Sequence, residues 1–164
     1  MESNFPQALL PKRFFVTTGK GLSNHSPLNA FDAALVDAGI HQCNLVPVSS
    51  ILPSDVEEIE FYKFPPGAIT FCVMAKHVGR AGEVIGAGIC WGMGIDSEGN
   101  RYGLVVEAHG HLNNESLEAE LRMKLREMAR IRRMRLYASG VKVDSMVVPR
   151  GKYGCVVAAL VFAP

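Results

Sequence analysis

The chain alternates short apolar runs with glycine-rich turns, and this pattern limits the folds that it can adopt. Three such runs lie in the middle of the sequence, at residues 69–75, 84–91 and 102–108. Their length and their β-branched residues favour strands over helices. A fourth run at 153–162 is apolar enough for a strand that is buried on both faces.

Further strands are expected nearer the N-terminus. Residues 14–18 predict a short strand that ends at Gly19, with a loop rich in Gly, Ser and Asn after it. Residues 43–49 read as an edge strand, because Pro47 lacks the N–H group that a central strand must donate. The acidic stretch 51–66 is expected to be a solvated loop with a short strand.

A first helix is predicted to begin at Ser26-Pro27 and to end at Gly39. Serine supplies the capping oxygen, and proline at the first helical position loses no hydrogen bond. Glycine is the usual residue where a helix stops. The apolar residues at helical spacing are Leu28, Phe31, Ala34, Leu35 and Ala38.

A second helix is predicted from Asn113 or Asn114 to Gly140, with a half-buried strand following at 141–144. Its expected apolar stripe is Leu117, Leu121, Leu125, Met128 and Ile131. Two helices and six or seven strands joined by short turns indicate an α+β sandwich.

The composition indicates one domain that also makes contacts with other subunits. A chain of 164 residues can bury about 70% of its unfolded surface, so it needs no disulfides to fold. Apolar residues reach 48%, and charged residues are 20% where about 25% is usual. This excess predicts a buried subunit interface.

Charge and cysteine usage exclude several classes of partner. The net charge of +1 provides no general attraction for nucleic acid or an anionic membrane. No apolar run is long enough to span a membrane, and the N-terminus lacks the order of a signal peptide. Four widely separated cysteines read as reduced thiols, which predicts a cytoplasmic protein. They are Cys43, Cys72, Cys90 and Cys155.

Seven basic residues fall between positions 122 and 135 of the second predicted helix. A solvated helix face is the favoured interpretation, because the run contains no interleaved aromatic residues. A non-enzymatic RNA-binding protein that uses this basic helix stays open as an alternative. The residues are Arg122, Lys124, Arg126, Arg130, Arg132, Arg133 and Arg135.

Glu107, His109 and His111 share one face if the strand at 102–108 continues. Carboxylate and imidazole groups could bind a metal, but no fourth ligand is evident, so we expect no metal site. Considered by itself, Glu107 is the charged residue at the end of the apolar run GLVV. Its carboxylate either points to solvent or enters a pocket with a raised pKa, as a proton donor would.

The glycines between residues 79 and 94 do not form a phosphate-binding loop. They include no G-K-[ST] sequence and lie within a strand pattern, where they indicate close packing instead.

Adjacent serines at 49 and 50 allow one specific reaction in a constrained turn. The Ser50 hydroxyl can attack the preceding carbonyl and convert the peptide bond into an ester. β-Elimination then cuts the chain and leaves dehydroalanine, which tautomerises and hydrolyses to a pyruvoyl group with release of ammonia. Taken alone, a Ser-Ser pair is usually an ordinary turn.

Three segments together resemble the pyruvoyl-dependent arginine decarboxylases. They are PLNAFDAALVDAGIHQCNLVPVSSILP, GLVVEAHG and LRMKLREMARIR. The resemblance extends from about Phe14 to the C-terminus. It implies an αββα-type sandwich of mainly antiparallel sheets with two main helices, assembled as a homo-oligomer, a trimer or hexamer, whose pockets are shared between subunits.

The resemblance also assigns roles to single residues. Self-cleavage between Ser49 and Ser50 would give a β chain (1–49) and an α chain (50–164), with Ser50 becoming the covalent pyruvoyl cofactor. L-Arginine would form a Schiff base there and leave as agmatine and carbon dioxide. Glu107 matches the general acid, Asn44 a residue beside the cleavage site, and Asp32 the carboxylate that binds the guanidinium. An Ala-His pair follows Glu107 where an aromatic-acidic pair is expected, which leaves another amino-acid substrate open.

Overall fold

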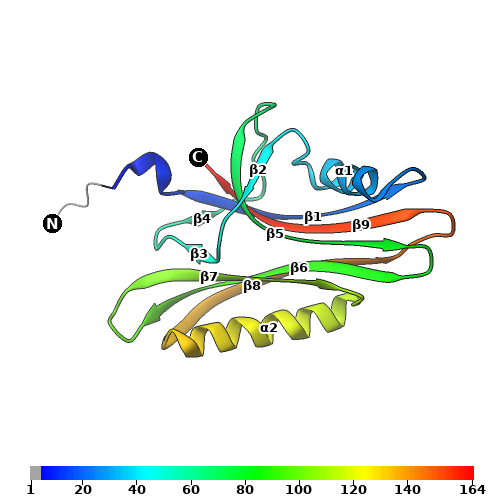
Figure 1. Cartoon of the computed structure of the whole chain (residues 1–164). Coiled ribbons are helices and arrows are strands. Elements are labelled where there is room, and N and C mark those ends of the chain that lie inside the picture. The colour runs from blue at the N-terminus through cyan, green and yellow to red at the C-terminus, as the bar shows by residue number, and fades with distance from the viewer. Residues whose placement is uncertain (1–4) are drawn as a thin grey trace.

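The computed structural model describes residues 5–164 and shows two helices and two β-sheets stacked in four layers (Figure 1). The helix α1 (Pro27–Ala38) covers the outer face of a five-stranded sheet. The helix α2 (Asn114–Ile131) covers the outer face of a four-stranded sheet. The α+β sandwich of mainly antiparallel sheets predicted from the sequence is therefore confirmed.

The five-stranded sheet has the strand order β2-β5-β9-β1-β4. Its central strands pair antiparallel, whereas β2 and β4 pair parallel to their neighbours at the two edges. The edge position predicted for residues 43–49 from Pro47 is confirmed for β2. The strands are β1 (Arg13–Ser23), β2 (Asn44–Pro47), β4 (Glu57–Glu58), β5 (Ile69–Arg80) and β9 (Tyr153–Ala163).

The four-stranded sheet is antiparallel throughout, in the order β3-β7-β6-β8. The strand β3 is only two residues long and pairs with the beginning of β7. Most of β7 therefore forms the edge of this sheet. The strands are β3 (Ile51–Leu52), β6 (Val84–Asp96), β7 (Arg101–Gly110) and β8 (Met134–Val147).

Three apolar clusters hold the four layers together. The central cluster lies between the sheets, where Val73 of β5, Ile89 of β6 and Val105 of β7 are buried. A second cluster joins α1 to the five-stranded sheet, and a third joins α2 to the four-stranded sheet. Because side chains alternate along a strand, each sheet sends every second residue to the core and the others to a helix.

The helix α1 begins and ends as the sequence predicts. Asn29 N–H donates to the side chain of Ser26, and Gly39 ends the helix with a φ of 77°. Most of the predicted stripe is confirmed: Ala34 and Ala38 are buried with Ala30, and Phe31 and Leu35 are partly buried against the same cluster. Leu28 is the exception, because it is 73% exposed. The small alanine side chains allow the helix to lie very close to the sheet.

The strand β1 is longer than predicted, because it continues through Gly19 to Ser23. The prediction of a loop there was wrong. A Cβ atom at Gly19 would collide with the backbone of Ala34 in α1, and one at Gly21 with the backbone of Ala30. These glycines permit close helix–sheet packing, which leaves an extended strand intact.

The helix α2 ends at Ile131, so the predicted end at Gly140 was wrong. Arg133 has a φ of 51° in a tight turn, and β8 starts at Met134. Gly140 instead lies within β8 against the ring of Trp91. The basic run consequently divides between helix, turn and strand. The buried residues of α2 are Leu117, Leu121, Leu125 and Ala129, while Ile131 of the predicted stripe is 67% exposed.

The remaining expectations concern membranes and cysteines. Within residues 5–164, no helix is both long and apolar enough to cross a membrane. All four cysteines are free thiols, and three of them are buried.

Candidate functional site

The connection between β2 and β3 carries the two serines from one sheet to the other. The backbone N–H of Val48 donates to the carbonyl of Cys72 on β5 at 2.8 Å. The backbone N–H of Val105 on β7 donates to the carbonyl of Ser50, also at 2.8 Å. The peptide that links Ser49 to Ser50 therefore lies between two anchors, one on each sheet. Ser49 itself is exposed and Ser50 is partly buried.

Glu107 lies at the same edge of the sandwich as this junction. It follows Val105, the residue that binds Ser50, by two positions on β7, so both side chains point toward the opposite sheet. Its charge also reaches β5. The pKa of Cys72 is raised to about 11 by burial first, then by Cys43, and by Glu107. The fold thus brings Ser50 and Glu107, 57 residues apart in sequence, to one sandwich edge.

The surroundings of Glu107 shift the pKa of its carboxyl in both directions, and the net change is an increase. Partial burial raises the pKa of its carboxyl, although part of the side chain stays exposed, and the nearby His109 and Lys124 act in the opposite direction. Lys124 reaches over from α2 and donates from Nζ to the Glu107 carbonyl at 3.3 Å. Its ammonium is also paired with Glu120 at 2.9 Å. Glu107 thus shows a feature of each of the two interpretations, since the residue is exposed at the sheet edge and the pKa of its carboxyl is raised.

Three histidines gather beside Glu107, and one of them could not be found from the sequence. Nδ1 of His77 on β5 lies 3.0 Å from Nδ1 of His109 on β7. The ring of His111 meets that of His77 edge-on, with centroids 4.8 Å apart, and its Nδ1 donates to the Val84 carbonyl at 3.1 Å. His77 is far from this segment in sequence, and only the pairing of the sheets places it here.

The spacing of the histidine group bears on the metal site considered for Glu107, His109 and His111. Among the described residues, no group of three or more His, Cys, Asp or Glu side chains is arranged to hold a metal ion. The pKa of His77 is lowered by burial, by His109 and by His111, while Glu83 acts in the opposite direction.

Asn44 lies on the edge strand β2, and its side chain is hydrogen-bonded to the turn before β5. Its Nδ2 donates to the carbonyl of Gly67 at 3.0 Å, and its backbone N–H donates to Ala68 at 2.8 Å. Both bonds fix the turn that precedes β5. The predicted role beside the cleavage site stays a prediction.

Asp32 lies apart from the other candidate residues. It is an exposed residue of α1, on the outer face of the five-stranded sheet. That sheet separates the helix from the four-stranded sheet that carries Glu107 (Figure 1). A single chain therefore does not bring Asp32 to Ser50.

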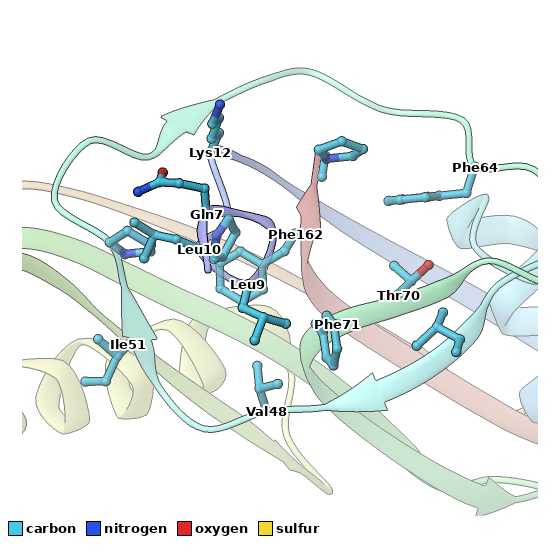
Figure 2. A pocket seen from close by; sticks show the side chains of 15 residues that line it. Gln7, Leu9, Leu10, Lys12, Val48, Ile51, Phe64, Thr70, Phe71 and Phe162 are labelled. Atoms are coloured by element: carbon cyan, nitrogen blue, oxygen red, sulfur yellow. The ribbon is translucent and has the colours of Figure 1, made fainter. Parts of the chain in front are cut away.

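A hollow of about 920 Å³ opens next to the serine connection. Figure 2 shows Val48 and Ile51, which flank the serines, among the side chains that line it, together with Leu9 and Phe71. Its lining is mainly apolar and includes none of the four candidate residues Asn44, Ser50, Glu107 and Asp32. It is therefore adjacent to the candidate site rather than part of it.

Fold and site together define a class of small αββα sandwiches, in which a strand-to-strand crossover at one edge presents a Ser-Ser peptide beside a carboxyl with a raised pKa. The chain belongs to the pyruvoyl-dependent arginine decarboxylase family, whose model matches residues 13–164. The family uses a covalently bound pyruvoyl group.

Curated relatives extend over nearly the whole chain. A pyruvoyl-dependent arginine decarboxylase of Methanopyrus kandleri is 38% identical over 153 residues, which cover 93% of this chain and 97% of the relative. Pyruvoyl-dependent arginine decarboxylase 2 of Archaeoglobus fulgidus is 33% identical and covers 94% and 98% respectively. The pyruvoyl-dependent arginine decarboxylase of Methanothermobacter thermautotrophicus is 34% identical over 137 residues, which cover 82% of this chain and 86% of the relative.

Proposed function

We propose that this chain is a self-processing decarboxylase that converts L-arginine to agmatine and carbon dioxide. The observation that carries the proposal is the Ser49–Ser50 peptide, anchored between two sheets beside Glu107 in a chain of this family. It acts as one domain, which cuts itself into residues 1–49 and 50–164.

Self-cleavage starts when the Ser50 hydroxyl attacks the Ser49 carbonyl. The hydrogen bonds of Val48 and of the Ser50 carbonyl limit the motion of the chain on either side of this bond. A peptide restrained in this way loses less entropy on reaching a reactive geometry than a free loop does. Asn44, six residues upstream, is the side chain proposed to hydrogen-bond the reacting carbonyl, for which its amide must leave the Gly67 carbonyl or use its second N–H.

The modified residue fits the position of Ser50. Processing changes the nitrogen and the side chain of residue 50 but keeps its backbone carbonyl, so the bond from Val105 N–H can persist. When formed, the pyruvoyl group supplies a carbonyl that accepts the electrons left by departing carbon dioxide.

Glu107 is the proposed general acid. The substrate carboxylate leaves as neutral carbon dioxide, so each turnover takes up one proton at the α-carbon. A carboxyl can deliver that proton only if it is still protonated near neutral pH. Partial burial raises the pKa of Glu107 in the required direction.

Asp32 is the proposed partner of the substrate guanidinium, through a charge-assisted bond. Because the five-stranded sheet separates it from Glu107, a complete site requires Asp32 of another copy. We therefore propose a homo-oligomer, either a trimer or a hexamer. Exposed apolar side chains around the serine connection support a subunit contact there: Val46, Val48, Ile51, Ile69 and Phe71.

The alternatives are weaker. On α2, Arg122, Lys124 and Arg130 are each paired with a glutamate of the same helix, which reduces the positive charge available to RNA. A decarboxylase for another amino acid is tested by measuring carbon dioxide release from a panel of amino acids. The free cysteines support a cytoplasmic location.

The decisive experiment follows the mass of the purified chain with Ser50→Ala. Without the attacking hydroxyl, the variant should stay one intact chain, whereas the wild type should give two fragments. Ser54→Ala, an exposed serine four residues downstream, is the matched control and should cleave normally. Cleavage of Ser50→Ala at the wild-type rate, or a wild type that stays intact, would refute the proposal.

A second experiment separates processing from catalysis. Glu107→Gln should cleave but release carbon dioxide at least about 100-fold more slowly, since an amide is a very weak acid. Full activity of this variant would remove Glu107 from the mechanism.

A further inference from the structure

An imidazole pair joins the same two strands that anchor the serine connection. Nδ1 of His77 on β5 lies 3.0 Å from Nδ1 of His109 on β7. The strand β5 also binds Val48 on one side of the serines, and β7 binds the carbonyl of Ser50. The serine connection and the imidazole pair therefore bridge the same two strands at two places.

The two bridges lie at corresponding positions along the strands. The inner face of β7 presents Val105, Glu107 and His109 in turn, and that of β5 presents Ala75 and then His77. Along β7 the imidazole pair lies about 14 Å from the anchor at Val105, since an antiparallel strand rises about 3.4 Å per residue. Glu107 lies between the two bridges.

We propose that the hydrogen bond between His77 and His109 is a positioning contact for self-cleavage, because it fixes the spacing of the two strands that hold the Ser-Ser peptide. Neither histidine belongs to the reacting groups, so both act through the anchors of that peptide. The attack of a hydroxyl on a neighbouring carbonyl is sensitive to such spacing, since a displacement of about 1 Å can slow a reaction about 100-fold. The inference rests on the self-cleavage proposed above.

The contact tolerates no more than one positive charge. A hydrogen bond between two Nδ1 atoms requires a proton on one and a free lone pair on the other, so the accepting ring is neutral, while the donating ring can be neutral or cationic. Burial lowers the pKa of the His77 imidazole, and the neighbouring His109 and His111 lower it further. Only Glu83, in the turn before β6, acts in the opposite direction. A second proton therefore enters the pair below the ordinary histidine pKa of about 6.5, and it breaks the bond.

The other charged groups near the pair lie on β7 and α2. Glu107 interacts with His109 on its own strand and with Lys124 of α2. Lys124 is also paired with Glu120 at 2.9 Å. Because the pKa of Glu107 is raised, its charge can change in the same pH range as that of the histidines. The test therefore compares variants that all keep Glu107, each at the same pH.

The test measures the rate of self-cleavage by mass, at about pH 7.5 and about pH 5, on chains freshly made by cell-free translation. His77→Leu removes the polar partner and should cleave about fivefold more slowly than the wild type at the higher pH, the factor that corresponds to one hydrogen bond. His77→Asn places an amide near the position of Nδ1, which can donate or accept but takes up no proton. It should cleave at the wild-type rate at the higher pH and about fivefold faster than the wild type at the lower pH.

The controls separate the hydrogen bond from a general effect of losing a histidine. His25→Gln, at an exposed position outside this edge, should match the wild type at both pH values. If His77→Leu does not fold, judged by circular dichroism in the Ser50→Ala background, His77→Asn decides alone. The inference is overturned if His77→Leu cleaves at the wild-type rate, if His77→Asn is as slow as His77→Leu, or if the ratio of His77→Asn to wild type is the same at both pH values.

The result also distinguishes this inference from the proposed function. If the wild type stays intact, self-cleavage fails and the inference fails with it. If the wild type cleaves and Ser50→Ala does not, while both His77 variants keep the wild-type rate at each pH, only the role of the imidazole pair is refuted.

Discussion

Replacing Gly19 by alanine tests how closely α1 lies on the five-stranded sheet. The added Cβ would overlap the carbonyl oxygen of Ala34 and lie 2.6 Å from the nitrogen of Ala38, both backbone atoms of the helix. Backbone atoms cannot move aside as the end of a flexible side chain can. The helix must therefore shift away from β1 or the strand must bend.

The cost follows from the extent of the overlap. Overpacking of a core typically destabilises by 1–3 kcal/mol, and because both colliding groups here are backbone we expect about 3 kcal/mol. For a domain of this size, each kcal/mol lowers Tm by roughly 2–4 °C. Gly19→Ala should therefore melt about 6–12 °C below its parent.

The assay is thermal unfolding followed by circular dichroism. Gly19→Ala is made in the Ser50→Ala background, so that differences in self-cleavage do not alter the chain that unfolds. Leu22→Ala, at an exposed position of the same strand, is the control and should change Tm by less than about 2 °C. A Tm of Gly19→Ala within 2 °C of its parent would show that α1 is not packed as tightly as the structure indicates.

Three further changes test the core and the candidate site. Leu121→Ala, at a fully buried position of α2, should lower the free energy of unfolding by about 3 kcal/mol in thermal unfolding. Met123→Ala, at a 65% exposed position of the same helix, should lower it by less than about 0.5 kcal/mol, and equal effects would contradict the assigned buried face of α2. Asp32→Asn should raise the KM for arginine at least about tenfold with little change in kcat, because a hydrogen bond between charged groups contributes about 1.5–3 kcal/mol. An unchanged KM would mean that another residue binds the guanidinium. Asn44→Ala should slow self-cleavage measured by mass, while a wild-type rate would limit Asn44 to its bond with Gly67.

The sequence located helices and strands well where their ends or positions depend on hydrogen bonds between residues close together in the chain. Ser26 and Gly39 mark the ends of α1, because capping depends on groups within one turn of the helix. The edge position of β2 also follows from one local fact, the missing N–H of Pro47.

Glycine was the main source of error, because its local pattern has more than one physical cause. Gly19 reads as a strand end and Gly140 as a helix end, yet both lie inside strands, where another element leaves no room for a Cβ atom. The sequence could not separate a turn from a close approach, since the approaching atoms belong to Ala34 and Trp91, distant in the chain.

Some residues of the candidate site could be found from the sequence and others could not. The Ser-Ser pair, Glu107 and Asp32 were found from the sequence, through motifs that resemble a known family. The family is confirmed, whereas the roles of these residues stay predictions. His77 gave no signal, because only the stacking of β5 over β7 brings it to His109.

The amino-acid sequence by itself determined the order and type of most elements, their caps, and the family of the chain. Capping, strand periodicity and motif spacing all depend on residues close together along the chain, so they can be read directly. Only the tertiary structure decided that the Ser49–Ser50 peptide lies between the sheets beside Glu107, and that Asp32 lies apart from both. These relations depend on the packing of two sheets, which joins residues that the sequence separates.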